Sequence, residues 1–429
     1  MSESLERLVD ALILRGGHNT TLVVIGTTLL GLAGGVAGSL ALLRKRSLFA
    51  DALGHAALPG VCVAFLVARA LGAEGRSLPV LLVGAAIAAL VATWLVQLIL
   101  RRTRLHEDAA IGSVLSVLFG FGVVLLSIIQ TLPSGDQGGL KGFLFGQTAA
   151  MQRGDAILLA AIAAVTAITA FLCLKEFALV AFDEGFARSV GLPSGRMDGL
   201  MLLLVVGVTV AGLQAVGLVL VIAILIIPPV AARLWTDSMH RFVPLAALLG
   251  AASGWIGTSL SAAAPRLPAG ALIVLTAASI FLVSLALAPR GLLRAMARRT
   301  RLRIRMANDH ILKSLLEGPL DAAELARRCA HGWLANRALL TALSMRSLVE
   351  HVGGRWRLTA TGEARGRAIA RNHALWTAYL TRDAAIAPDH VDPSAELVEH
   401  ILDAEIVAEL ERSLTGPTTV PATMRETQR

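Results

Sequence analysis

An aspartate and a histidine stand four residues apart in an otherwise apolar run of small residues, SLFADALGHAALPG, from Ser47 to Gly60. Residues at this spacing lie on one face of an α-helix, one turn apart. A carboxylate oxygen and an imidazole nitrogen are both accepted as ligands by first-row divalent cations. Ionisable side chains inside a membrane are costly and usually face a partner or a water-filled path. Asp51 and His55 therefore predict a cation path. The alternative is a capping role for Asp51 and simple helix packing for His55.

A second group of metal-ligand residue types lies near the carboxy terminus. The stretch SAELVEHILDAE places Glu396, Glu399 and His400 within one helical turn, and His373 lies on an earlier predicted helix. Carboxylates and imidazoles from two helices suit Mn(II), Fe(II) or Zn(II). The alternative is a solvated acidic helix face, and the spacing alone does not choose between the two.

The composition indicates what must position these residues. The chain has 429 residues, of which 55% are hydrophobic and 16% charged, which is too apolar for an ordinary soluble domain. Up to about residue 289 the charges cluster between apolar runs, and beyond it they recur every few positions. We expect an all-α polytopic membrane bundle of about nine spans followed by a cytoplasmic domain. The expected spans are 21–43, 51–71, 78–100, 109–130, 155–174, 197–213, 216–234, 243–261 and 268–288.

The basic residues predict the orientation. The clusters Arg44 to Arg46, Arg101 to Arg104 and Arg290 onward fall on one side if the spans alternate, and that side should be the cytoplasm. We therefore expect a multi-pass protein of the cell (inner) membrane, with the amino terminus outside and the carboxy-terminal domain inside. The three cysteines show no CxxC spacing, so neither a disulfide framework nor a thiolate zinc site is predicted.

The predicted cytoplasmic stretch AFDEGFARSVGL, residues 181–192, is typical of a short amphipathic helix. Phe182 and Phe186 are four residues apart, Arg188 follows, and Gly191 is a stop signal. Such a helix between two spans suits docking on a motor protein, and the alternative is an interfacial helix without a partner. The sequence contains no G-x-x-x-x-G-K-[ST], so we expect no bound nucleotide in this chain and a separate ATPase subunit.

The carboxy-terminal part begins with a basic juxtamembrane segment, 290–307, which suits contact with anionic lipid. A helix, a helix-turn-helix and a hairpin at Gly353-Gly354 predict a winged helix-turn-helix over 308–360. A helical metal-binding or dimerisation segment is expected over 361–412 and a flexible tail over 413–429. Asn336 and Arg337, on the expected recognition helix, are candidate DNA contacts.

The run Asp51 to Gly60, DALGHAALPG, resembles the signature D-A-x-x-H-A-x-L-P-G of the permease subunits of bacterial ABC importers for zinc, manganese and iron. The run GLQAVGLVLVIAILIIPPVAARL is also similar to that family's late spans. The resemblance implies that Asp51 and His55 act in metal passage and that the chain is a transport subunit rather than an enzyme. It implies a cytoplasmic ATP-binding subunit, an extracytoplasmic metal-binding protein and a second permease copy as partners. The 181–192 segment looks like the coupling helix of ABC permeases.

The segment RNHALWTAYL…HVDPSAELVEHIL is similar to the dimerisation and metal-sensing helices of the diphtheria-toxin-repressor class, especially its manganese-sensing branch, over about residues 308–412. The resemblance implies that His373, Glu396, Glu399 and His400 are metal ligands. That branch also takes ligands from its first helix, where this chain offers Asp309 and His310. The expected recognition helix, 334–348, departs from that family's Ser/Thr-rich start.

Together these patterns predict a permease subunit of an ATP-driven importer of Mn(II), Zn(II) or Fe(II), carrying a cytoplasmic metal-responsive domain. The rival hypothesis is a membrane-anchored metal-dependent transcription regulator whose membrane part only tethers it or signals. A tether would not need Asp51 and His55.

Overall fold

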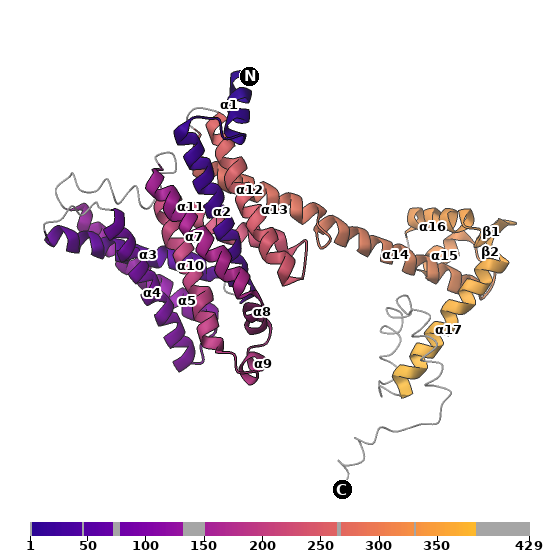
Figure 1. The fold of residues 1–429 in the computed structure, drawn as a ribbon. Helices are drawn as coiled ribbons and strands as arrows, with labels where there is room; N and C mark the ends of the chain where they lie inside the picture. The colour runs from indigo at the N-terminus through magenta and orange to yellow at the C-terminus, as the bar shows by residue number, and fades with distance from the viewer. Residues whose placement is uncertain are drawn as a thin grey trace, which may run out of the picture. The chain divides into compact units, whose positions relative to one another are not determined.

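The computed structural model describes residues 2–44, 47–71, 78–131, 151–263, 267–329 and 332–382. The chain divides into two compact units, Met1–Arg294 and Ala295–Arg429 (Figure 1). All the regular elements described in the first unit are helices, and the second unit also contains a two-stranded sheet.

Eight helices of the described residues are long and apolar enough to cross a membrane. The remaining predicted span, 216–234, corresponds to α11, a helix of only 16 residues. The helices of the first unit are α1 (Ser2–Leu12), α2 (His18–Leu43), α3 (Ser47–Ala70), α4 (Leu78–Arg102), α5 (Glu107–Gln130), α7 (Arg153–Leu172), α8 (Leu174–Phe182), α9 (Glu184–Ser189), α10 (Ser194–Val216), α11 (Leu218–Arg233), α12 (Met239–Ala263) and α13 (Ala269–Leu287).

Helix α2 is the centre of the first unit, with contacts to α7, α10, α11 and α12 (Figure 1). Small residues allow the closest of these approaches. A Cβ atom placed on Gly31 would lie 2.1 Å from the carbonyl oxygen of Gly250, and one placed on Gly250 would lie 2.1 Å from the carbonyl oxygen of Gly31. Close backbone approach through small residues is the usual way in which membrane helices associate.

One glycine separates α10 from α11, and two prolines lie near the end of α11. Gly217 has a φ of 84°, a backbone angle that residues with a side chain disfavour, and it separates the two helices without a loop. Helix α11 continues through Pro228 and Pro229. Pro229 removes the N–H that would bond the Leu225 carbonyl. The Leu225 carbonyl lies against Gly38 of α2, where an added Cβ on Gly38 would be 1.9 Å from the Leu225 oxygen. Helix α2 therefore covers the carbonyl oxygen that lacks its helical donor.

Helices α3, α4 and α5 form a second group in the first unit (Figure 1). Gly60 of α3 and Gly84 of α4 meet directly, because a Cβ on Gly60 would lie 2.1 Å from the Gly84 oxygen. Gly122 of α5 lies against Leu58 and Pro59 of α3, with 2.9 Å from an added Cβ to each side chain. Helix α3 is therefore held between α4 and α5 one turn beyond His55.

The second unit contains most of α14 (Leu292–Leu315), followed by α15 (Ala322–Arg328), α16 (Trp333–Met345), β1 (Val349–Val352), β2 (Arg355–Leu358) and α17 (Ala360–Arg382). The predicted hairpin is confirmed: β1 and β2 pair antiparallel, with Val352 opposite Arg355. Gly353 and Gly354 both have positive φ, 60° and 80°, as a tight two-residue turn requires. The basic segment expected as a linker is helical and belongs to α14.

The core of the second unit is small and apolar. Ile311 and Leu312 of α14, Leu325 of α15 and Leu340 of α16 are fully or almost fully buried. Leu320, before α15, exchanges two backbone hydrogen bonds with Trp356 of β2. The hairpin is thereby tied to the helices it follows.

Candidate functional site

Asp51 and His55 lie on one face of α3, as their spacing predicts. The Nε2 atom of His55 is 3.4 Å from Oδ1 of Asp51, and both side chains are about one third exposed. The imidazole stands edge-on to the Phe119 ring of α5, with 5.0 Å between the ring centroids. Its Nδ1 atom is buried and has no hydrogen-bond partner among the described residues. The pair thus offers carboxylate oxygen and an uncommitted ring nitrogen side by side, a donor set that suits a divalent transition metal.

The other residues of the run position this pair. Ala52, Ala56 and Ala57 are buried and let α3 pack closely against its neighbours. Pro59 has no N–H, so the carbonyl oxygen of His55 lacks its usual partner four residues along the helix. The alanines thus allow close helix packing, and the proline leaves the His55 carbonyl oxygen without its helical hydrogen bond. The polar atoms of this run therefore lie around His55.

The pair also lies close to the start of α3. At 1.5 Å per residue, Asp51 stands about 6 Å and His55 about 12 Å along the helix from Ser47. Arg44, which caps the end of α2, lies seven residues before Asp51 in the chain.

The predicted single helix over 181–192 is wrong in one respect: the segment belongs to two helices. Helix α8 ends at Phe182 and α9 begins at Glu184, so Phe182 and Phe186 do not share one helix. The cause is Asp183, which has extended backbone angles and whose Oδ1 accepts a hydrogen bond of 2.8 Å from the Phe186 N–H. An aspartate in this position caps a new helix instead of continuing the previous one.

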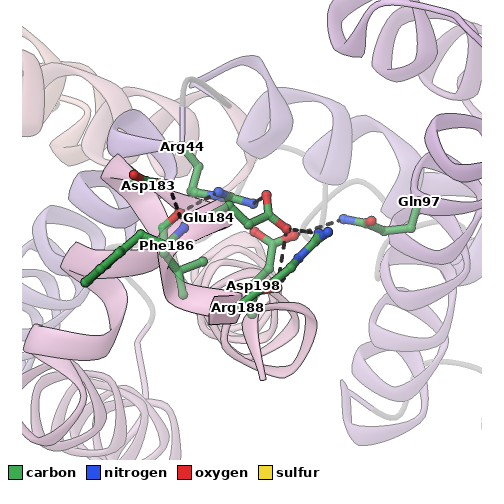
Figure 2. A network of polar contacts seen from close by, with 9 residues as sticks. Arg44, Gln97, Asp183, Glu184, Phe186, Arg188 and Asp198 are labelled. Atoms are coloured by element: carbon green, nitrogen blue, oxygen red, sulfur yellow. Dashed lines mark hydrogen bonds and ion pairs between the residues drawn. The ribbon is translucent and has the colours of Figure 1, made fainter. Parts of the chain in front are cut away.

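The end of α9 carries exposed apolar side chains. Phe182, Phe186 and Val190 are each more than half exposed. Gly191 follows with a φ of 83°, and its N–H bonds the Arg188 carbonyl, which closes the helix as its sequence predicts. In Figure 2 the Phe186 ring points away from the neighbouring charged groups.

A partly buried ion-pair network connects α9 to the membrane helices (Figure 2). The Nε of Arg44 donates to Oδ1 of Asp198 on α10 at 2.9 Å, and its Nη1 donates to the Val180 carbonyl of α8 at 2.9 Å. Its Nη2 lies 3.5 Å from Oε2 of Glu184 on α9. The Nε2 of Gln97 on α4 donates to Oδ2 of Asp198 at 3.4 Å. One guanidinium thus joins α2, α8, α9 and α10, and Asp198 extends the network to α4.

Glu184 is the residue of α9 that carries this connection. Arg188, one turn along, also pairs with Glu184 and donates from its Nε to Ser194 Oγ at 3.0 Å. Partial burial by itself would raise the pKa of Glu184, but the hydrogen bond from Arg188 and the charges of Arg44 and Arg188 together lower it below the usual value of 4.5. These contacts therefore favour the ionised, paired form of the carboxylate.

Sequence reasoning missed this network, although one signal was present. Asp198 is an acidic residue within the expected span 197–213, and such a residue needs a partner. The partner, Arg44, is 154 residues away in the chain and was visible only as one of a basic cluster.

The expected ligands of the second unit are described only in part. His373 lies half-buried on α17, and Asp309 and His310 lie on α14, where Asp309 is buried. Glu396, Glu399 and His400 lie outside the described residues. Within the ranges that are described, no three His, Cys, Asp or Glu side chains come together as a metal-binding group.

The two candidate DNA contacts differ in exposure. Asn336 is buried, and its Nδ2 donates to the Ala322 carbonyl at 2.8 Å. Its amide thus joins α16 to α15 and is not presented at the surface. Arg337, the next residue, is exposed.

The first unit is thus a bundle of apolar helices long enough to cross a membrane, with a carboxylate-imidazole pair in one helix and an exposed capped helix beside a partly buried network. Residues 18–288 match the ABC 3 transport family, and the chain belongs to that family. Residues 359–426 match the metal binding and dimerisation domain of the iron dependent repressor family.

The curated relatives agree with this assignment. The chain is 39% identical over 389 residues to the manganese transport system membrane protein MntC of Bacillus subtilis, covering 87% of this chain and 88% of the relative. It is 42% identical over 280 residues to the zinc transport system membrane protein TroC of Treponema pallidum, covering 65% and 92%. Among solved structures, PsaBC from Streptococcus pneumoniae in complex with Fab aligns with a TM-score of 0.56 and 29% identity, covering 67% of this chain and 97% of that one.

Proposed function

We propose that the chain is the permease subunit of an ATP-driven importer of Mn(II), Zn(II) or Fe(II). The observation that carries the proposal is the Asp51–His55 pair inside an apolar helix, with the imidazole Nδ1 buried and unbonded among the described residues. Membership of the ABC 3 transport family supports it, as do manganese and zinc transport in the names of two relatives. The metal is cargo: it would be delivered outside by a binding protein, pass this pair, and leave toward the cytoplasm.

The chemistry of the pair suits transient binding. One carboxylate and one imidazole supply two of the four to six ligands that these ions usually take, so the ion would keep water or gain ligands from other helices. A site this incomplete binds weakly enough to release its ion when the helices move. The His55 carbonyl, which Pro59 leaves without its helical donor, is one further oxygen within the same turn.

Metal uptake by single variants tests the path. Asp51→Asn and His55→Ala should abolish uptake of the transported element, measured element by element in cells and in proteoliposomes, while insertion and ATPase association stay intact. Asp10→Asn and His240→Ala, which change the same residue types at exposed positions, are the matched controls. Uptake at the wild-type rate by either path variant would refute the proposal.

We propose that α9 docks on a separate cytoplasmic ATP-binding subunit. Phe182, Phe186 and Val190 are exposed apolar side chains at and beside α9, and Glu184 pairs with both Arg188 and Arg44 of the network. In this proposal the network transmits movement of α9 to the end of α2 and hence to α3. The chain would work with a second permease copy, with its amino terminus outside and the second unit in the cytoplasm.

The docking surface is tested by a pull-down. Phe186→Asp places a charge in the apolar contact and should release the ATPase, whereas Met345→Asp, which places the same charge at an exposed apolar position of the second unit, should leave the ATPase bound. If the Phe186 variant keeps its ATPase, docking must use another segment, for which residues 106–108 are the next candidate.

We propose that the second unit senses cytosolic metal. The match of residues 359–426 to a metal binding and dimerisation domain supports this role, and the order of α14, α15, α16, β1, β2 and α17 is compatible with a winged helix-turn-helix over 308–360. We assign 1–289 to the permease and 361–412 to the metal-binding segment. The proposed ligands are His373, Glu396, Glu399 and His400, with Asp309 or His310 from α14.

Calorimetry on the full chain separates the two metal sites. In an Asp51→Asn background, the second unit should still bind Mn(II), and Glu399→Ala should remove that binding while Glu363→Ala, on α17, leaves it unchanged. Under feedback gating, Glu399→Ala alone should let uptake continue at high internal metal. Absence of any binding in the Asp51→Asn chain would rule out metal sensing.

The rival function, a membrane-anchored transcription regulator, has one exposed candidate residue, Arg337, because Asn336 is engaged inside the protein. It requires that the metal-loaded full chain select one DNA duplex over others and that Arg337→Ala weaken that selection. The transport proposal requires neither result.

A further inference from the structure

A polar cavity of about 510 Å³ lies within the second unit, between α14, the end of α16 and the first turns of α17. Four arginines line it: Arg301, Arg305, Arg346 and Arg365. Asn308 and Asp309 add polar atoms from α14, and leucine and isoleucine side chains complete the wall. The cavity lies away from the beginning of α16, where DNA reading would be expected.

Local packing brings the four arginines together. Arg301 and Arg305 are one turn apart on α14, and Arg346 caps the end of α16. Arg365 lies between two glycines of α17 that permit close contact. A Cβ on Gly362 would lie 1.9 Å from the Leu348 oxygen, and one on Gly366 would lie 3.1 Å from the Leu316 side chain. The backbone that carries Arg365 is thus pressed against the segments that carry the other three.

The charges in the cavity are unbalanced. Within the part of the chain that the structure describes, none of the four guanidinium groups makes an ion pair or a hydrogen bond, whereas Arg328, Arg357 and Arg367 of the same unit each pair with a glutamate. Asp309 is the single carboxylate of the cavity wall. Four like charges around one carboxylate repel one another, so a bound anion would stabilise this arrangement.

Asn308 gives a second, independent indication of a ligand. Its Oδ1 is buried and has no hydrogen-bond partner among the described residues. A buried polar atom without a partner is costly. The oxygen and nitrogen of an asparagine amide exchange places by a half-turn of the group, so Asn308 can present its NH2 to the cavity. An amide donor beside four guanidinium groups is a donor set for an anion.

We propose that this cavity binds a phosphate-bearing anion with two or more negative charges. Guanidinium groups pair with phosphate oxygens through two parallel hydrogen bonds, which makes arginine the usual residue for this recognition. The volume is that of a small-molecule site. The phosphate belongs either to a free phosphorylated molecule or to a lipid headgroup, because α14 carries the basic run that follows the membrane helices.

Titration of the purified full chain with pyrophosphate tests the proposal. Binding should weaken about tenfold or more in Arg346→Gln and in Arg365→Gln, because each removes a charge-assisted bond to the anion. Arg355→Gln on β2, an exposed arginine outside the cavity, makes the same change in net charge and should bind as the wild type does. Arg365→Lys, which keeps the charge but not the two-bond geometry, should lie between wild type and Arg365→Gln. Folding is checked by the elution volume and thermal midpoint of each variant.

A second arm distinguishes the two sources of phosphate. Pyrophosphate binding in detergent that depends on Arg346 and Arg365 identifies a free phosphorylated ligand. The same dependence seen only in nanodiscs containing phosphatidic acid, and absent with phosphatidylcholine alone, identifies a lipid headgroup. The proposal is overturned if neither probe binds, if Arg355→Gln weakens binding as much as the cavity variants do, or if only a DNA duplex binds.

Discussion

Replacing Arg44 by methionine should destabilise the first unit more than its place near a helix end suggests. The Arg44 and Asp198 side chains are only 15% and 11% exposed, and their contact is 2.9 Å. Methionine keeps an unbranched apolar stem but removes the guanidinium, so the Asp198 carboxylate stays buried without its counter-charge. Removing one partner of a buried ion pair lowers the free energy of unfolding by about 3–5 kcal/mol, because the other charge stays buried and unpaired. We expect the lower end, about 3 kcal/mol, because the Gln97 amide still donates to Asp198.

Two further variants isolate the electrostatic part of this loss. Arg44→Met combined with Asp198→Asn removes the stranded charge and should recover part of the lost stability, as a double-mutant cycle measures. Arg233→Met is the matched control, because Arg233 and Asp237 form an exposed pair, with side chains 42% and 59% exposed. The free energy of unfolding should fall by about 1 kcal/mol or less in Arg233→Met.

The assay must report on the first unit alone. Cys62 is buried in α3 and Cys329 is buried in the second unit, so alkylation of the two thiols during an SDS titration in mixed micelles follows each unit separately. Arg44→Met should shift the Cys62 transition and leave that of Cys329 unchanged. The reasoning is refuted if Arg44→Met and Arg233→Met shift the Cys62 transition equally, or if the double variant is no more stable than Arg44→Met.

Two other predictions concern packing and pH. Gly60→Ala should destabilise the first unit and impair uptake, because its Cβ would meet the Gly84 oxygen at 2.1 Å; Gly112→Ala on α5, with nothing within 4 Å, should be neutral or stabilising by about 0.5–1 kcal/mol. The lowered pKa of Glu184 means that its ion pairs contribute stability above the ordinary value of 4.5 and lose it as the pH falls through the lower folded-state pKa. The Cys62 assay checks the Gly60 prediction, and the thermal midpoint measured as a function of pH checks the Glu184 prediction. In Arg188→Gln the acid loss should move to higher pH; an unchanged acid transition would contradict the assigned cause.

Local patterns in the sequence were sufficient for much of this protein. The spacing of Asp51 and His55 places them on one helix face because the helical period is a local property of the backbone. Long apolar runs specify spans because the hydrocarbon layer requires that length. Gly353 and Gly354 specify a tight hairpin because only glycine readily takes positive φ at both positions. Each of these inferences depends on residues close together in the chain.

The division between α8 and α9 marks where local pattern reading was insufficient. The four-residue spacing of Phe182 and Phe186 predicted one helix, but Asp183 between them supplies a side-chain oxygen to the Phe186 N–H and starts a new helix. Aspartate can follow one helix or cap the next, and the sequence does not say which. The competing hydrogen bond decided the outcome.

Tertiary structure alone brought together the charged groups that are far apart in the chain. Arg44 and Asp198 are separated by 154 residues, and the four arginines of the second-unit cavity come from three different elements. Many arginines and acidic residues of this chain could have paired, because Coulomb attraction is not selective among them. Packing of α2 against α10 brought Arg44 to Asp198, and packing of α17 against Leu348 placed Arg365 beside the other cavity arginines. A buried charge without a partner is costly, so pairing has a large energetic effect only where the charge is buried. Burial is a property of the whole fold and cannot be read from a short stretch of sequence.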